Sequence, residues 1–382
     1  MIFFGVDRIS EYRGILTGRV ALLTAPSGRT SGNRSTIAVL QECCDLVLLL
    51  APEHGVRGDK AAGALFADET DEDSGLPVRS LYTKESKRLS AETLEKFDTL
   101  VYDIADVGCR YYTFISTLKF CIADCARAGK RLVVLDRPNP LGDRVEGGVL
   151  QDAVSSFVGC HSLPVCYGLT CGELALMLNQ ELHAGCDLHV VPCAGLARHM
   201  TFRDWGLPWV MPSMGIPRYE TALLYPGTCL IEGTNCSEGR GTADPFAIIG
   251  APFIKAEAFC TAFNALHCPG VVATPVYFTP TASKHQGILC GGIHLHILDE
   301  ALVKPVELGV TLLDLLRTLY PADFRLLPPH QAGGRPFLSL LAGHRDFENP
   351  GWRPEEILRR YEEESSNFRR RKAPFEIYPT EC

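Results

Sequence analysis

Residues 45–58 read DLVLLLAPEHGVRG and join an unbroken apolar run to a polar turn. A short apolar run without alternation is typical of a strand that is covered on both faces, as in a parallel sheet. Similar strands are predicted at 98–104 (DTLVYDI) and 131–136 (RLVVLD), and a further strand at 19–26 (RVALLTAP). These four segments indicate the central sheet of an α/β protein.

Helical patterns lie between the predicted strands. One covers residues 34–44, a short one begins at Ser90, and one runs from about 113 to 128 and ends at Gly129. The resulting βαβα order predicts a doubly wound parallel sheet. A capping box from Thr170 to Glu173 then opens another helix, and a strand is expected at 187–192.

The amino-acid composition of the chain changes beyond residue 195. Gly, Pro and aromatic residues are dense through 204–253, which indicates long loops around a site. Later elements are predicted at 255–266, 271–278, 291–298 and 306–319, with a charged helix from about Pro354. A length of 382 residues suggests two domains. We place them at 1–160 and at 161–382, the latter a smaller α/β domain that completes the cleft.

Composition excludes several classes of protein. The net charge of −8 argues against a nucleic-acid partner, and no apolar run reaches the roughly 20 residues of a membrane span. Residues 1–14 carry no apolar signal-peptide core, so we expect a cytoplasmic protein. The 16 cysteines include no CxxC pair and are interpreted as reduced, buried side chains. We predict neither a metal ion nor a cofactor, because dinucleotide and phosphate loops are missing and the pair His294 and His296 lacks a third ligand nearby in sequence.

Polar clusters follow three of the predicted strands, at 52–58, 105–113 and 137–140. All three lie at carboxyl ends of parallel strands, the edge where open α/β sheets bind ligands. A fourth cluster, EGTNCSEGRGT at 232–242, combines acids, an arginine and glycines in a loop suited to gripping a ligand.

The residue types in these clusters suit glycoside hydrolysis, which commonly uses two carboxyl groups. Glu53 follows an apolar strand, and partial burial is expected to keep it protonated as the acid. Asp103 or Asp106 would supply the second carboxylate or orient sugar hydroxyls, with His54 and Arg57 beside Glu53. Each of these acids also has a structural interpretation as a cap, a turn residue or part of an internal ion pair, as does the run 136–139.

Seven motifs in this chain resemble the NamZ-type exo-β-N-acetylmuramidases and occur in that family's order. They are PEHGVRG, DIADVGCRYYTFISTL, LDRPNPLG, GLTCGELA, ETALLYPGT, EGTNCSEGRGTADPF and IGAPF. The resemblance covers residues 15–378. It implies a Rossmann-like N-terminal domain, a smaller C-terminal domain, an active site between them, and release of N-acetylmuramic acid (MurNAc) from the non-reducing end of peptidoglycan fragments.

The resemblance also assigns residues. It places the catalytic acid at Glu53 and maps Asp103 and Asp106 onto acidic motif positions, and we expect Asp103 or Asp106 to assist. MurNAc carries a lactyl carboxylate, which an arginine fork suits, so Arg57, Arg110 or Arg240 is expected to bind it. The remaining expected substrate contacts are His54, Tyr112, Thr113, Asn139, Glu232, Ser237, Glu238 and Thr242.

The chain departs from the family pattern at three loops. Ala105 stands where Gln is usual, Ala25 where Asn is usual, and residues 212–217 read PSMGIP in place of PSPNMP. These changes leave open a muropeptide-binding protein that has lost catalysis as an alternative to the muramidase. A metal-dependent hydrolase of another cell-wall bond is a third alternative.

Overall fold

A seven-stranded sheet forms the first part of the molecule, seen here in a computed structural model that describes residues 1–60, 63–83, 86–329, 331 and 333–380. Its strands are parallel except for the edge strand β3. The spatial order is β3 (Glu69–Thr70), β4 (Pro77–Ser80), β2 (Asp45–Ala51), β1 (Arg19–Thr24), β5 (Thr99–Asp103), β6 (Arg131–Leu135) and β9 (Asp187–Val191). The four strands predicted first are therefore confirmed as neighbours in one sheet.

Helices cover both faces of this sheet. Along β5, Leu100 and Tyr102 point into a core shared with α3 (Phe114–Ala128) and α4 (Cys171–Glu181). Val101 points to the opposite face, where α1 (Thr36–Cys43) and the 3-10 helix η1 (Gly5–Ile15) pack. Burial on both faces explains why the strands lack alternation, and the predicted doubly wound α/β fold is confirmed.

The large sheet extends past the boundary that we expected near residue 160. The helix α4 packs on β9, and β9 pairs with β6 as the seventh strand. We call residues 1–191 the large-sheet half. The boundary at 160 falls inside it because α4 and β9 continue the same strand–helix alternation without a break in composition.

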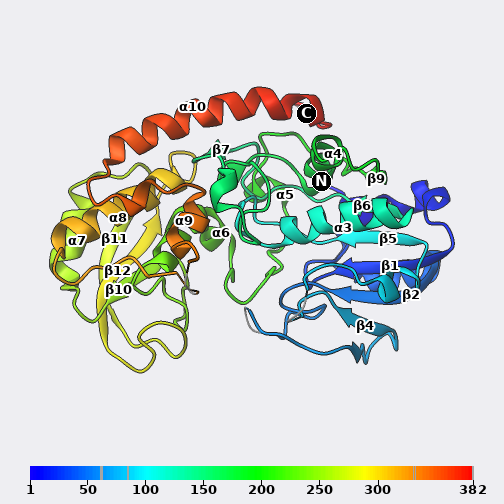
Figure 1. The fold of residues 1–382 in the computed structure, drawn as a ribbon, viewed down its shortest axis with the longest axis horizontal. Coiled ribbons are helices and arrows are strands. Elements are labelled where there is room, and N and C mark those ends of the chain that lie inside the picture. Colours follow the sequence, from blue (N-terminus) through cyan, green and yellow to red (C-terminus); the bar gives the residue numbers. More distant parts are fainter. Residues whose placement is uncertain (61–62, 84–85, 330, 332, 381–382) are drawn as a thin grey trace.

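A smaller antiparallel sheet forms the second part, which we call the small-sheet half (residues 219–342). Its strands lie in the order β10 (Ile248–Ala251), β12 (Cys290–Ile297) and β11 (Val271–Phe278). Its helices are α6 (Tyr219–Thr228), α7 (Ala256–Asn264), α8 (Pro305–Leu319) and α9 (Phe337–Ala342). Figure 1 shows the two halves side by side.

One long helix, α10 (Pro354–Lys372), spans the top of both halves in Figure 1. It begins at the predicted Pro354 and buries Ile357, Tyr361 and Phe368. It packs on α8 of one half and on β7 (Val145–Glu146), which pairs with β8 (Cys166–Tyr167). The helix therefore fastens the two halves together along one edge.

The remaining elements are short. They are α2 (Ala91–Leu94), α5 (Phe202–Trp205), η2 (Asp152–Val154), η3 (Cys229–Gly233), η4 (Asp346–Glu348) and η5 (Ala373–Phe375). None of the helices in the described ranges combines the length and apolarity needed to cross a membrane. Cys121, Cys125 and Cys171 are buried thiols in the core beside α3 and α4, as predicted for small apolar side chains.

Candidate active site

A cavity of about 1240 Å³ lies between the two halves. The large-sheet half contributes polar and aromatic side chains to its lining, and the small-sheet half contributes a cluster of charged side chains. The polar and aromatic lining includes Glu53, His54, Tyr82, Tyr112, Thr113, Phe157, Tyr225, Glu232, Glu238, Arg240, Thr242, Phe246 and Lys284. One cavity is thus lined by aromatic side chains and by carboxylates whose positions lie almost 200 residues apart in the chain.

The turn after β2 presents Glu53. His54 and Gly55 both adopt positive φ angles, of 74° and 78°, and the Gly55 amide donates to the Pro52 carbonyl at 3.0 Å. A left-handed His costs about 1 kcal/mol or more, so the surroundings must hold it. The His54 ring does so through Nδ1, 3.2 Å from the Lys60 carbonyl, and through an edge contact with Phe114. The strained turn therefore fixes where Glu53 points.

Both oxygens of Glu53 accept hydrogen bonds. Oε2 accepts from the Thr113 hydroxyl at 2.6 Å and Oε1 from the Gly63 amide at 2.9 Å. The Tyr82 phenol also lies close. Burial, together with the Glu53 carboxylate, raises the pKa of Tyr82 to about 12, so this phenol stays protonated at neutral pH. Glu53 is therefore oriented by three groups of the large-sheet half.

A charged cluster faces Glu53 from the small-sheet half. Arg240 Nε donates to Glu232 Oε1 at 2.8 Å and lies 3.6 Å from Glu238 Oε1. Lys284 Nζ lies 2.9 Å from Glu238 Oε2 and donates to the carbonyls of Ile231 and Thr234, both at 2.9 Å. Burial raises the pKa of Glu232, Arg240 opposes the rise, and the Glu238 charge adds to it. Burial thus favours the protonated form of Glu232.

Backbone conformation and close contacts explain why glycines stand on either side of Arg240. Gly239 and Gly241 adopt φ angles of 82° and 79°, which favour glycine. A Cβ at Gly239 would lie 2.6 Å from the Ile248 carbonyl, and one at Gly241 would lie 2.4 Å from the Ala282 amide nitrogen. The SEGRGT motif therefore turns sharply against β10 and the 281–284 loop, and this turn brings Arg240 and Glu238 to the cavity.

Aromatic side chains form the wall between the two acidic sides. Tyr112 packs edge-on against Phe114 and Tyr225, with ring centroids 4.9 and 6.0 Å apart, and Tyr225 packs on Phe246 at 4.8 Å. The Tyr112 hydroxyl is buried and forms no well-oriented hydrogen bond with any described residue. Burial raises its pKa, so it is available as a neutral donor to a ligand.

The structure does not bring Asp103 or Asp106 to this cavity. Asp103 is fully buried and accepts from Arg137 Nη2 at 2.9 Å and from the Thr36 hydroxyl. Asp106 accepts from the Tyr167 hydroxyl and the Val107 amide, and burial raises its pKa to about 7. Both were expected at the substrate, but internal partners already satisfy them.

The crevice at the carboxyl ends of β1 and β5 is largely filled. Asp106 borders a small cavity of about 60 Å³ there, walled by Trp205, Pro208 and Trp209. These side chains belong to the Gly- and Pro-rich segment after residue 195. This chain's own loop thus fills part of the sheet edge at which we predicted the site. Residues of the predicted clusters 52–58 and 105–113 nevertheless line the larger cavity beside it.

Four other residues that we predicted to contact the substrate bind groups of the protein instead. Arg57 forms a paired contact with Asp71, 2.7 Å at each nitrogen, and Asn139 donates to the Leu169 carbonyl at 3.1 Å. Arg110 is fully buried and donates to the carbonyls of Gly148, Leu163 and Leu341 at 2.6–2.7 Å. Ser237 is buried and accepts from the Gly239 amide at 3.1 Å. None of these four residues lines the cavity, so Arg240 is the remaining one of the three arginines expected at the lactyl group.

Several lining residues escaped prediction from sequence. Tyr82 and Phe157 lie in loops without a motif, and Lys284 follows a strand more than 40 residues after the SEGRGT loop. Their only signal was their type, an aromatic or a cation in a loop. The changed segment 213–217 does line the cavity, with Met214, Gly215 and Ile216 among its wall residues, whereas Ala105 borders the small cavity beside Asp106.

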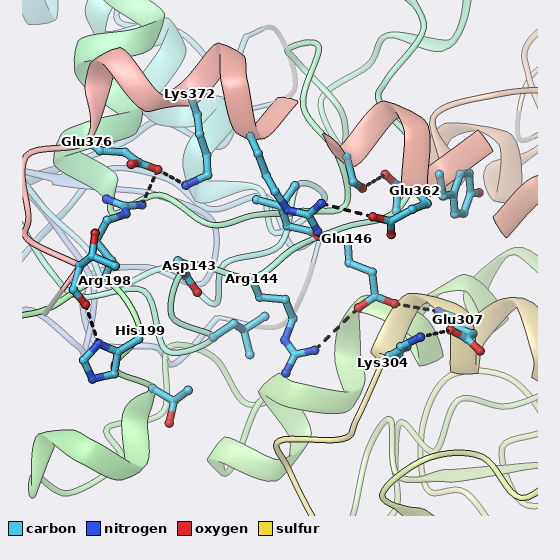
Figure 2. A pocket seen from close by; sticks show the side chains of 18 of the residues that line it. Asp143, Arg144, Glu146, Arg198, His199, Lys304, Glu307, Glu362, Lys372 and Glu376 are labelled. Atoms are coloured by element: carbon cyan, nitrogen blue, oxygen red, sulfur yellow. Dashed lines mark hydrogen bonds and ion pairs between the residues drawn. The ribbon is translucent and has the colours of Figure 1, made fainter. Parts of the chain in front are cut away.

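A second cavity, of about 660 Å³, lies under α10 (Figure 2). Its charged side chains largely bind one another. Arg198 and Lys372 both reach Glu376, and Lys304 reaches Glu307. Glu146 accepts from the Val306 and Glu307 amides at 2.9 Å, which ties β7 to the start of α8. We interpret this space as a polar joint between the halves.

Potential metal ligands are dispersed. Among the residues that the structure describes, no three His, Cys, Asp or Glu side chains are grouped to hold a metal ion. His294 lies 2.7 Å from Asp244 Oδ2, and His296 lies 2.8 Å from the Thr274 hydroxyl. The predicted interpretation of these two as strand histidines with protein partners is confirmed.

A cavity with opposed carboxylates and aromatic walls has the groups that sugar-cleaving enzymes use. Family models for the N-terminal and C-terminal parts of exo-beta-N-acetylmuramidase NamZ match residues 20–220 and 223–378. The chain belongs to this family, so the resemblance seen in the sequence and the prediction of a glycosidase are confirmed.

Individual relatives agree over nearly the full length. The chain is 40% identical to the peptidoglycan beta-N-acetylmuramidase NamZ of Bacillus subtilis, over 98% of this chain and 91% of that protein. Two crystal structures of DUF1343 family proteins from Bacteroides fragilis cover 99% of both chains. They are 34% and 29% identical to it, with TM-scores of 0.89 and 0.79.

Proposed function

We propose that this enzyme releases β-linked MurNAc from the non-reducing end of peptidoglycan fragments, with Glu53 as the general acid. The main support is the position of Glu53: an acid at the end of β2, in an oriented turn, facing a cavity large enough for a disaccharide. The name and extent of the Bacillus subtilis relative support the substrate class.

Glu53 would donate its proton to the glycosidic oxygen. A general acid must lie within hydrogen-bond reach of that oxygen and hold its orientation. The Thr113 hydroxyl and the Gly63 amide supply the orientation, because each binds a different oxygen of the carboxyl group. Tyr112, whose buried hydroxyl forms no well-oriented hydrogen bond with any described residue, would hold a sugar hydroxyl or the acetamido group.

The second carboxyl group would come from the small-sheet half. Asp103 and Asp106, our first candidates, are satisfied by internal partners, whereas Glu232 and Glu238 line the cavity. Arg240 and Lys284 keep that pair oriented and partly neutralised. His54 and Thr242 complete the proposed substrate contacts.

The test is incubation with the disaccharide MurNAc-GlcNAc and identification of the products by mass. GlcNAc-MurNAc, which carries the same two sugars in the opposite order, is the matched control. We expect free MurNAc from the first and no cleavage of the second. Cleavage of both would refute non-reducing-end specificity, and saturable binding of MurNAc-GlcNAc without release would favour the binding protein.

A further inference from the structure

The turn from Ser213 to Ile216 is fixed in the wall of the cavity. The Ile216 amide donates to the Ser213 carbonyl at 3.0 Å, and both residues are buried. The Trp209 indole donates to the Ile216 carbonyl at 3.1 Å, which ties the turn to the loop before it. Met214 and Gly215, the two residues in the middle of the turn, line the cavity. The turn therefore presents them to a ligand in a set position.

Gly215 lies against the guanidinium of Arg240. A Cβ at this glycine would lie 3.1 Å from Nη1 and 3.8 Å from Cζ of Arg240. Glu232 occupies a different edge of the guanidinium, since both Nε and Nη2 lie 2.8 Å from its Oε1. The Arg240 side chain is 31% exposed. Because residue 215 has no side chain, the edge that carries Nη1 can receive a carboxylate in the paired geometry of an arginine fork.

The charges around Arg240 permit an anion to approach. Lys284 lies 2.9 Å from Glu238 Oε2 and supplies a countercharge for that acid. Burial raises the pKa of Glu232, the other acid of the cluster, and so favours its protonated form. The cluster consists of two cations and at most two anions. It therefore carries no net negative charge that would repel a ligand carboxylate.

Met214 provides an apolar surface next to this cation. It precedes Gly215 in the chain, so the Cα atoms of the two residues lie about 3.8 Å apart. Met214 is 71% exposed, whereas Ile216, two residues further on, is buried. A large apolar side chain that is exposed on a fixed turn in a cavity wall is available for contact with a ligand. The turn thus places a cation and an apolar group side by side.

The lactyl group of MurNAc has the matching chemistry, because one of its carbon atoms bears both a carboxylate and a methyl group. We propose that Arg240 Nη1, left open at Gly215, binds the lactyl carboxylate and that Met214 packs on the lactyl methyl group. Gly215 and Met214 are then specificity-determining residues. This inference rests on the proposed function, because it assumes that MurNAc occupies this cavity. Both residues lie in the segment that departs from the family pattern, so the contact with Met214 is a property of this chain.

The experiment is calorimetric titration with three free sugars: MurNAc, its neutral lactyl carboxamide, and 3-O-carboxymethyl-GlcNAc, which lacks only the methyl group. The ratio of Kd for the carboxamide to Kd for MurNAc measures the charge preference. The corresponding ratio for the carboxymethyl sugar measures the methyl preference. The proteins are wild type, Gly215→Ala, Met214→Ala and, as a matched control, Met211→Ala. Met211 is a 44% exposed methionine of the same loop that does not line the cavity.

Each variant should change one preference and keep the other. We expect wild type to show a charge preference of about tenfold or more and a methyl preference of about threefold. Gly215 is not among the glycines with positive φ, so alanine fits the backbone, and its Cβ would force Arg240 Nη1 to move by a few tenths of an ångström. Gly215→Ala should therefore lower the charge preference about threefold or more. Met214→Ala should lose only the methyl preference, and Met211→Ala should keep both.

Four results would overturn the proposal. They are an unchanged charge preference in Gly215→Ala, an unchanged methyl preference in Met214→Ala, an equal loss of affinity for all three sugars in either variant, and a wild type that binds the three sugars equally or not at all. The Kd ratios do not require turnover, so they separate this proposal from the proposed function. If MurNAc-GlcNAc is not cleaved, the proposed hydrolysis fails, and the ratios still decide how the lactyl group is recognised.

Discussion

The Thr113 hydroxyl donates a 2.6 Å hydrogen bond to Glu53 Oε2 and leaves the helix that it precedes without a side-chain cap. Thr113 is the N-cap residue of α3, where a threonine side chain usually binds a helix amide and contributes about 1 kcal/mol to stability. Here that hydroxyl orients a carboxylate from the β2 turn instead. The start of α3 is therefore a support for Glu53.

Removal of this hydroxyl should weaken catalysis more than binding. We expect Thr113→Val to lower kcat about tenfold, because a misoriented acid transfers its proton less effectively, with a smaller change in KM. Thr113→Ser, which keeps the donor, should retain most of the activity. Steady-state kinetics on the nitrophenyl β-MurNAc glycoside test this; equal kcat values for the Val and Ser variants would contradict the orienting role.

Loss of the acid itself should be more severe. Glu53→Gln keeps the shape and the acceptor for Thr113 but cannot donate the catalytic proton, so we expect release of MurNAc from MurNAc-GlcNAc to fall by about 1000-fold or more. Binding of MurNAc, measured by calorimetry, should persist. The exposed Glu42→Gln on α1 is the control. Turnover of Glu53→Gln near that of wild type would exclude Glu53 as the acid.

Arg110 should matter for folding and hardly for recognition. Its guanidinium holds three carbonyls from separate segments, and Arg110→Met would leave them buried without donors. We expect a loss of about 3–5 kcal/mol in the free energy of unfolding, measured with urea. The exposed Arg127→Met serves as the control, with a loss below about 1 kcal/mol. A stable Arg110→Met protein with a raised KM for the nitrophenyl β-MurNAc glycoside would show instead that Arg110 contacts the substrate.

The joint under α10 should be sensitive to pH. Burial raises the pKa of Glu146 to about 7, although the amides of Glu307 and Val306 and the Arg144 charge oppose the shift (Figure 2). The folded protein therefore favours protonated Glu146 more than the unfolded chain does. The stability from this preference is full below about pH 4, the pKa of an unfolded glutamate, and is lost as the pH rises through 7.

Glu146→Gln keeps the acceptor for both amides and removes the titration. We expect the variant to match wild type near pH 4.5 and to exceed it at pH 8 by on the order of 2 kcal/mol in the free energy of unfolding. Burial also raises the pKa values of Asp106 and Asp136, so these groups change the stability with pH in the same direction as Glu146. Both are present in the variant and in wild type, so their contributions cancel in the comparison. Parallel pH profiles for the two proteins would show that Glu146 contributes nothing to this dependence.

The fold was accessible from sequence because it depends on local patterns. Apolar runs without alternation predict strands covered on both faces, and the elements between them predict helices. The domain boundary was not accessible, since β9 joins a sheet whose other strands end more than 50 residues earlier. Pairing of β6 with β9 is a property of the folded chain and leaves no mark at residue 160.

The candidate site divides in the same way. The residue types at the strand ends, and the family motifs that contain them, predicted a polar site and the importance of Glu53. They also placed Asp103 at the same site as an assisting acid, because it ends an apolar strand much as Glu53 follows one. The difference comes from partners: Arg137 and Thr36 enclose Asp103, whereas Glu53 faces open space.

The amino-acid order by itself determined the α/β class, the family and the acids and arginines available for chemistry, because these follow from periodicity and from motifs of a few residues. Only the tertiary structure decided which charged side chains are bound inside the protein, as Arg110 is, and which face the cavity, as Glu53 does. Whether a buried charge is neutralised depends on groups that come from distant segments, and their approach is set by packing rather than by neighbours along the chain.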